Sequence, residues 1–229
     1  EPVEHLSEVV GFAAITRPAE AQTFTVSGQF QLSTPGPYVA VGDVNGDGKP
    51  DVVTSGTITA GVVKVMVSLG DGAGGFAAGI VAATLDNSPW TAIALGDVNG
   101  DGKLDLAIVN VQAGVSVLLG NGAGQFGPRV DCAIPAFSLA RDVKIADMTG
   151  DGRPDLVVGW EGEMAIFPGD GAGGFGARQD FSLFNHARDV EIGDLNGDGL
   201  PDVCVTTTEN TLAVLLADGT GGYLPRIEY

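Results

Sequence analysis

The nine-residue stretch DVNGDGKPD, residues 43–51, occurs four times in this chain with little change. It returns as DVNGDGKLD at 97–105, as DMTGDGRPD at 147–155 and as DLNGDGLPD at 194–202. Each copy is followed by a glycine-rich stretch that ends in an aromatic residue: LGDGAGGF at 69–76, LGNGAGQF at 119–126, PGDGAGGF at 168–175 and LADGTGGY at 216–223. Repetition with a period of about 50 residues indicates an architecture built from repeated units.

Short apolar, β-branched runs stand between these markers, such as YVAV (38–41) before the first acidic stretch and VVKVMVSL (62–69) after it. Runs of this length bounded by Gly, Asn and Asp are typical of strands, and no window shows a sustained helical period. Four antiparallel strands in about 50 residues form one propeller blade. We therefore predict an all-β fold, a β-propeller of about four to five four-stranded blades. Solenoids and sandwiches are alternatives, but neither requires this rhythm.

The repeats divide the chain into four predicted blades, at about 38–86, 87–136, 137–185 and 186–229. Residues 1–37 are predicted to form a partial blade or strands that close the ring, because EVVGFAAI (8–15) and QTFTVSG (22–28) have the composition of strands. A four- or five-bladed ring is compatible with this pattern, and so is a part of a larger ring that another copy of the chain completes.

The composition limits the partners that this chain can have. Its 229 residues include 29 acidic and 11 basic ones, for a formal charge of −18. Such a surface repels phosphate backbones and anionic lipids, so we expect neither nucleic acid nor a membrane as partner. The start EPVEHLSEVV has no signal-peptide features, and a leader removed before residue 1 is compatible with it. Cys132 and Cys204 occupy non-equivalent places and are expected to be buried free thiols.

The repeated acidic stretch has the chemistry of a calcium loop. Calcium takes six to eight oxygen ligands at roughly 2.3–2.6 Å. Alternate residues of a tight loop can turn inward, so side chains at positions 1, 3 and 5 converge and the Asp at position 9 closes the shell. Position 7 offers a backbone carbonyl, and the glycine at position 6 allows the sharp turn. The predicted ligands are Asp43, Asn45, Asp47, Lys49, Asp51, Asp97, Asn99, Asp101, Lys103, Asp105, Asp147, Thr149, Asp151, Arg153, Asp155, Asp194, Asn196, Asp198, Leu200 and Asp202.

An EF-hand, a magnesium site and a zinc site each fit the sequence of these loops less well. An EF-hand needs a Glu at position 12, where this chain has Thr54, Ile108, Val158 and Val205. Magnesium prefers stricter octahedral geometry, and zinc prefers His or Cys. The remaining alternative is a set of Asp/Asn/Gly turns whose side chains cap their own backbone. Four calcium ions would change the formal charge from −18 to −10, and the loop with Thr149 is expected to be the weakest site.

The acidic loop, followed about 25 residues later by GDGxGGF, resembles the FG-GAP/VCBS repeat family over residues 28–229. That family includes the propeller of integrin alpha chains, a fungal lectin and many secreted bacterial proteins. The resemblance implies a calcium-binding propeller, an extracellular location, and a role in carbohydrate recognition or adhesion. Full rings in the family often have seven blades, whereas this chain carries four complete pairs of markers.

A ligand site is expected at the end of the propeller opposite the acidic loops, where the connections vary between repeats. Aromatic rings there can stack on sugar rings, and Arg/Asp pairs can bond hydroxyls. Alternatively, ARD at 140–142 and at 187–189 forms ion pairs between blades and the tryptophans fill blade edges. The candidate residues are Tyr38, Trp90, Arg141, Asp142, Trp160, Glu161, His186, Arg188 and Asp189.

No catalytic constellation can be placed in this sequence. We therefore predict a non-catalytic, secreted binding module whose partner is a carbohydrate or an extracellular protein. The alternatives are an accessory or catalytic domain of a polysaccharide-degrading enzyme, or a purely structural scaffold stabilised by calcium.

Overall fold

The computed structural model describes residues 38–59, 62–86, 92–110, 114–134, 140–160, 162–183, 186–219 and 222–229. Residues 1–37, for which the sequence predicts a partial blade, lie outside this part. The described strands are β1 (Tyr38–Gly42), β2 (Asp51–Thr59), β3 (Val62–Ser68), β4 (Ile80–Asp86), β5 (Ile93–Gly96), β6 (Asp105–Asn110), β7 (Gly114–Gly120), β8 (Phe126–Cys132), β9 (Asp142–Ala146), β10 (Asp155–Trp160), β11 (Glu163–Phe167), β12 (Gln179–Ser182), β13 (Ala187–Gly193), β14 (Asp202–Thr207), β15 (Leu212–Leu215) and β16 (Ile227–Glu228).

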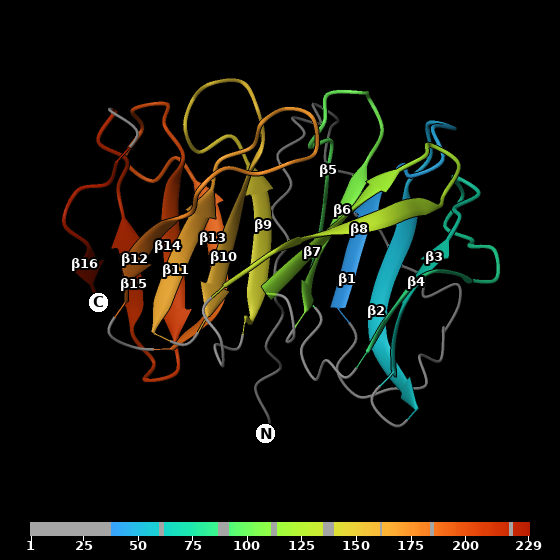
Figure 1. Cartoon of the computed structure of the whole chain (residues 1–229), viewed down its shortest axis with the longest axis horizontal. Coiled ribbons are helices and arrows are strands. Elements are labelled where there is room, and N and C mark those ends of the chain that lie inside the picture. Colours follow the sequence, from blue (N-terminus) through green and yellow to red (C-terminus); the bar gives the residue numbers. More distant parts are fainter. Residues whose placement is uncertain are drawn as a thin grey trace, which may run out of the picture.

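These strands form four antiparallel sheets of four strands, each in simple sequence order. Blade 1 is β1–β4, blade 2 is β5–β8, blade 3 is β9–β12 and blade 4 is β13–β16. Figure 1 shows the four sheets standing side by side like the blades of a fan. The prediction of an all-β propeller with four-stranded antiparallel blades is confirmed. No helix long and apolar enough to cross a membrane occurs in the described part of the chain.

The burial of each strand reflects the position of its blade in the row. In the inner blades, all residues of β6 and β10 are buried, because neighbouring blades cover both faces of these sheets. In blade 1, β3 alternates between buried and half-buried residues, so only one of its faces is fully covered. This difference shows that consecutive apolar residues of the inner strands are buried on both faces of their sheets, whereas those of β3 are fully buried on one face only.

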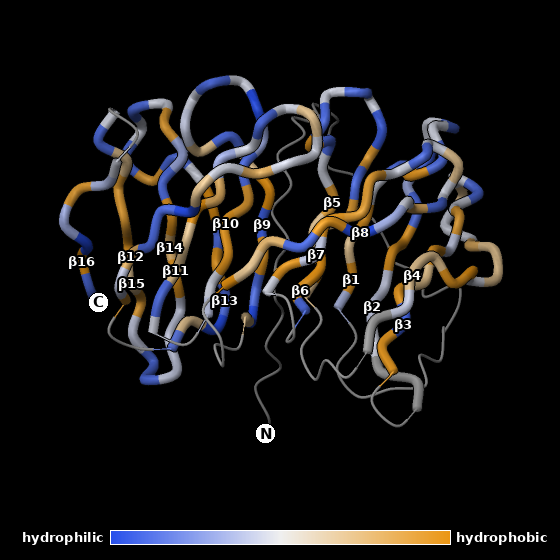
Figure 2. The backbone as a smooth tube through the Cα atoms, viewed as in Figure 1, coloured by the Kyte–Doolittle hydropathy of each residue, from blue (hydrophilic) through white to orange (hydrophobic). Residues whose placement is uncertain are grey.

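Hydrophobic residues concentrate along the strands (Figure 2), and buried apolar side chains of successive blades form shared clusters. Between blades 1 and 2, for example, Val53 and Val65 share a buried cluster with Leu106 and Ile108. Fully burying one such side chain stabilises the fold by about 1.5–3 kcal/mol, and the same kind of cluster occurs between blades 2 and 3 and between blades 3 and 4. Cys132 is buried and Cys204 is half-buried, both as free thiols.

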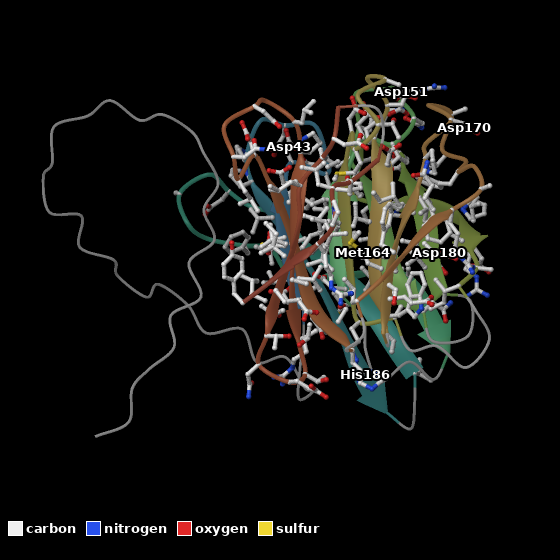
Figure 3. All side chains as sticks on the ribbon, turned by 90° about the vertical axis from the view of Figure 1, so that its left-hand side faces the viewer. Asp43, Asp151, Met164, Asp170, Asp180 and His186 are labelled. Carbon is white, nitrogen blue, oxygen red and sulfur yellow. The ribbon has the colours of Figure 1, made fainter. Side chains whose placement is uncertain are left out.

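The first strands of the blades lie innermost, with β1 next to β5, β5 next to β9, and β9 next to β13. The acidic stretches connect the first and second strands of each blade, and the glycine-rich turns connect the third and fourth. Both sets of loops therefore lie at one end of the molecule, where Figure 3 shows Asp43, Asp151 and Asp170, while His186 lies at the opposite end.

Close packing at the loop end explains the first glycine of the glycine-rich stretches in blades 1, 2 and 3. A Cβ atom at Gly70 would lie 2.0 Å from the carbonyl oxygen of Pro50, and one at Gly120 would lie 2.0 Å from that of Leu104. The end of the third strand thus passes directly over the end of the acidic loop. Blade 4 carries Ala217 at the corresponding place, as the sequence LADG shows.

Candidate functional site

The acidic loops are tight turns that the first Asp organises from within. In blade 1, Asp43 Oδ1 accepts a hydrogen bond from the Gly46 N–H at 2.7 Å, and its Oδ2 accepts one from the Gly48 N–H at 2.7 Å. Both glycines have positive φ values, 74° and 80°, which L side chains rarely adopt. Asp97, Asp147 and Asp194 receive the same pair of bonds in the other three loops.

The side chains at positions 3 and 5 continue this pattern at the surface. Asn45 Oδ1 accepts the Asp47 N–H at 3.0 Å, and Asp47 Oδ1 accepts the Lys49 N–H at 2.9 Å. The hydrogen bond from the Lys49 N–H is the main reason that the pKa of Asp47 lies below its ordinary value. In the second loop the pKa of Asp101 is lowered as well, first by its side-chain hydrogen bond with Lys103. Asp47 and Asp101 are therefore ionised, and both are exposed.

The residue at position 7 takes part in a way that the sequence did not reveal. Lys103 Nζ lies 3.1 Å from Asp101 Oδ2, and Lys49 and Arg153 form the same kind of ion pair with position 5 of their loops. Blade 4 has Leu200 at this position, and there the Asn196 amide donates to Asp198 Oδ2 at 2.8 Å. The fourth loop thus lacks the cationic side chain that competes for the carboxylate in the other three.

The Asp at position 9 has a different environment from the other three acidic or amide positions. Asp51 is fully buried; its Oδ2 accepts the Val44 N–H at 3.0 Å and its Oδ1 accepts the Gly70 N–H at 2.8 Å. It therefore joins the start of the acidic loop to the end of the third strand. Asp105, Asp155 and Asp202 make the corresponding bonds in blades 2, 3 and 4.

Burial raises the pKa of Asp105 and of Asp155, and backbone N–H donors, two for Asp105 and three for Asp155, partly offset this effect. Each of these carboxylates is held between the start of the acidic loop and the end of the third strand. We call the four residues Asp51, Asp105, Asp155 and Asp202 the brace carboxylates.

The loops offer suitable donors for a hard cation, although their side chains are arranged as self-capping turns. Among the described residues, no group of three or more His, Cys, Asp or Glu side chains is arranged to hold a metal ion. The available donors are nevertheless carboxylate, amide and carbonyl oxygens, the ligands that calcium prefers. A carboxylate oxygen that accepts one N–H keeps a second lone pair, and no atom lies within 4 Å of a Cβ placed on Gly48. The donor set therefore fits calcium.

Several of the predicted ligand residues meet near the innermost strands. Burial raises the pKa of Tyr38, and the negative charges of Asp142 and Asp189 raise it further. Asp142 is almost fully buried, and its Oδ2 accepts the Val190 N–H at 2.9 Å, which links blade 3 to blade 4. Burial and the neighbouring Asp189 carboxyl raise the pKa of Asp142 to about 6, against the charge of Lys144.

Other predicted ligand residues lie elsewhere. Trp160 is 1% exposed and belongs to the core between blades 2 and 3, so the prediction that it contacts a ligand is wrong; it fills a blade edge instead. His186 and Arg188 are exposed. Trp90 and Glu161 lie outside the described residues.

A groove of about 450 Å³ lies on blade 4, on the side of β14 and β15 that carries their connecting turn. That turn lies close to His186, whose carbonyl accepts the Thr208 N–H at 3.0 Å, so the groove is at the end away from the acidic loops. Tyr229, which is 72% exposed, is held beside β15 by two backbone bonds to Leu212. The residues that line the groove are Arg188, Asp189, Thr206, Thr207, Asn210, Thr211, Leu212 and Tyr229.

Sequence reasoning identified Arg188 and Asp189 but missed the rest of this groove. A signal was present, because the second strand of blade 4 ends in the polar run TTT (206–208), whereas that of blade 3 ends in GW (159–160). A second strand that ends in polar residues, where the equivalent strand of another blade ends in apolar ones, indicates that this end of the strand has different surroundings.

Comparisons with known proteins agree with this architecture. The family model described as an FG-GAP-like repeat matches residues 43–108 and 97–158, which together make up half of the chain. No curated protein matches the sequence.

Solved structures with a similar fold include a lectin from Agrocybe aegerita that recognises non-reducing terminal N-acetylglucosamine. It is 24% identical with a TM-score of 0.59, and the match covers 83% of this chain and 52% of the lectin. A protein from Lactobacillus plantarum is 12% identical with a TM-score of 0.61, covering 88% of this chain and 58% of that one. The chain thus spans about half the length of these two proteins, and identities this low show the fold alone.

The brace carboxylates give a prediction about stability. Replacing Asp105 by Asn leaves one acceptor oxygen and turns an NH₂ group toward a backbone N–H, so one buried donor loses its partner. We expect Asp105→Asn to lower the free energy of unfolding by about 1–3 kcal/mol in urea titrations with EDTA. The matched control is Asp101→Asn in the same loop, which changes an exposed carboxylate and should leave this free energy unchanged. Equal losses in the two variants would contradict the assignment.

The buried Asp142 gives a prediction about pH. Its pKa is about 6 in the folded protein and near 3.8 ordinarily, so between these values the folded chain binds a proton that the unfolded chain has released. Asp142 therefore lowers stability as pH rises from about 4 to 7. The variant Asp142→Asn lacks this loss of stability. We therefore expect the difference in melting temperature, variant minus unsubstituted protein, to grow as pH rises over this range, by about 2–4 °C for each kcal/mol of unfolding free energy. The exposed control Asp180→Asn should show no such trend.

Proposed function

Since this chain belongs to the FG-GAP-like repeat family, we propose that it is a non-catalytic, calcium-stabilised propeller module that binds carbohydrate. The observation that carries the proposal is the groove on blade 4, where hydroxyl, amide, guanidinium, carboxylate and aromatic groups face one space. Its volume of about 450 Å³ lies in the usual range for small-ligand sites.

The chemistry of the groove suits an uncharged sugar ring. Arg188 and Asp189 carry opposite charges, so together they offer donors and acceptors to hydroxyl groups without favouring an ion. Thr207 Oγ1 and Thr211 Oγ1 are hydrogen-bonded at 2.7 Å; Thr207 is buried, so the half-buried Thr211 is the more accessible hydroxyl of the two. The exposed ring of Tyr229 offers an apolar face with a polar edge, the combination that stacks on a pyranose.

The same groove lacks the parts of a hydrolytic site. Its lining contains Thr hydroxyls and one carboxylate, but no His, Cys or Lys that could act as a base, among the residues described there. A glycosidase of the usual kind needs two carboxyl groups across the scissile bond, and the groove presents Asp189 alone. These features favour binding over catalysis.

Calcium, in this proposal, supplies positive charge and oxygen coordination to the four acidic loops. Asp43, Asp97, Asp147 and Asp194 already collect the backbone N–H groups that shape the loops, which leaves little to reorganise when an ion arrives. Neutralising four loops would reduce the self-repulsion of a chain with a formal charge of −18. Extracellular modules bind calcium with dissociation constants of roughly 10⁻⁴–10⁻³ M, so a secreted location is part of the proposal.

Calcium removal tests the metal part of the proposal. We expect isothermal titration of EDTA-stripped protein to show about four sites and the melting temperature to fall steeply without calcium. At a calcium concentration 100 times the dissociation constant, one site contributes about 2.7 kcal/mol. The loop with Leu200 should bind most tightly because no Lys or Arg competes for Asp198, and Asp198→Asn should remove one ion. An unchanged melting temperature together with no titration heat would rule out calcium.

A glycan array in calcium tests the ligand. We expect binding to a defined set of glycans and a loss of about tenfold or more in affinity for Arg188→Ala, which removes one charged donor from the groove. The control is Arg129→Ala on β8, which removes an exposed Arg129–Asp131 ion pair far from the groove. Glycan binding that is equally affected by both changes would place the site elsewhere, and turnover of a polysaccharide would favour an enzyme.

A further inference from the structure

Blade 1 leaves uncovered a face that is buried in the other blades. Val39 and Val41 on β1 are each 63% exposed. Counted from the first Asp of the acidic loop, Val39 corresponds to Val143 in blade 3 and to Val190 in blade 4, and both of these are fully buried against the preceding blade. We call the surface formed by Val39, Val41, Val52, Met66 and Val81 the front face, after its position at the first blade.

Blade 4 leaves uncovered its other face, the one that in blades 1 to 3 packs against the following blade. Cys204 and Val214 are half-buried, and Ile227 beside them is 41% exposed. The corresponding residues of blade 3, Val157 and Ile166, are buried against blade 4. We call the surface formed by Asp189, Glu191, Cys204, Thr206, Leu212, Val214 and Ile227 the rear face.

We propose that the rear face of one copy of this chain docks onto the front face of a second copy. Three internal interfaces already join a surface of the rear kind to a surface of the front kind, between blades 1 and 2, 2 and 3, and 3 and 4. The contact between copies continues this series by the same packing. The contact joins a rear face to a front face, so a dimer with one such contact still has one free face of each kind. Two copies close a ring only when they form this contact twice.

One hydrogen bond of the interface between blades 3 and 4 has residues in the places of both its partners at the two ends of the row. Between blades 3 and 4, Asp142 Oδ2 accepts the Val190 N–H at 2.9 Å. Asp189 occupies the place of Asp142 in blade 4, and Val39 occupies the place of Val190 in blade 1. Docking therefore brings the exposed Asp189 carboxylate to the Val39 N–H of the second copy.

The size of the side chains also agrees with docking. Thr206 on the rear face occupies the place that Val109 has in blade 2, where a valine is fully buried against blade 3. Threonine and valine have nearly the same volume, so the spacing of blades 2 and 3, which admits Val109, also admits Thr206. The closer spacing of blades 3 and 4 does not, because a Cβ atom on Gly159, at this place in blade 3, would lie 2.8 Å from Val190 Cγ2.

The docked copy also contributes to the groove on blade 4, an extension that rests on the proposed function. Asp189, Thr206 and Leu212 belong to both the rear face and the groove. A second copy on the rear face thus adds β1 as a further wall beside these residues, and the groove becomes a site between two blades.

Sedimentation velocity of the full chain in calcium, over a wide range of concentrations and without sugar, tests the docking. We expect association to at least a dimer. The double variant Val39→Asp/Val41→Asp and the variant Thr206→Arg should each associate more than about a hundredfold more weakly. The first places unpaired charges against apolar side chains, and the second puts a side chain between the blades that is too large for the space of a valine. The matched control Val130→Asp changes a valine that is 47% exposed on the outer strand β8, and it should associate like the unsubstituted protein.

Mixing the two defective variants separates docking from misfolding. Each retains one intact face, so an equimolar mixture should regain a heterodimer with a single interface, which neither variant forms alone. A monomer at every concentration, or association that ignores Val39→Asp/Val41→Asp, would overturn the proposal. Glycan affinity is measured afterwards and separately: groove binding by a monomer would keep the proposed function and remove only the shared site.

Discussion

The buried carboxylate at the end of each acidic stretch is the interaction on which the blades depend. Asp51, Asp105, Asp155 and Asp202 each receive one backbone N–H group from the start of the acidic loop and one from the end of the third strand, and Asp155 receives a further one from Thr149. A single side chain thereby fixes three segments of one sheet relative to each other. The carbonyl that precedes it passes so close to the third strand in blades 1 and 2 that only glycine fits there.

This local constraint makes the row of blades possible. Once the loop end of each sheet is fixed, its two faces are flat enough to pack on neighbours, and valine, leucine and isoleucine side chains fill the spaces between sheets. Each such interface is formed by the same two kinds of surface, which is why the chain can repeat one solution. The same regularity leaves unlike faces uncovered on blades 1 and 4, and an interface that can be repeated within a chain can also be repeated between copies.

The repeated acidic loops and the proposed ligand groove lie at opposite ends of the strands. The loops at one end have similar sequences in all four blades and bind their own backbone in the same way, which suits a repeated structural role for a cation. The connections at the other end differ between blades, and in blade 4 they form a polar groove with an aromatic wall. Rigid sheets hold the variable connections in place, as in many binding proteins.

The sequence alone determined the fold class, the four-stranded blades, the position of each acidic loop between the first and second strands, and the family. These features depend on local periodicity and on glycine at fixed places, so they can be inferred from neighbouring residues. The sequence also placed Arg188 and Asp189 among the candidate ligand residues, and both lie near the start of β13, where they line the groove.

Only the tertiary structure decided how chemically similar side chains divide their roles. Asp43 and Asp51 are both aspartates of one loop, yet the first organises a surface turn and the second is buried, because the third strand approaches only one of them. Trp160 was expected at a ligand site and instead fills the core, since the neighbouring blade covers it. The groove likewise combines residues from β13, the turn after β14, and Tyr229, which are distant in sequence. Contacts of this kind depend on how sheets pack against each other, and no local pattern encodes that.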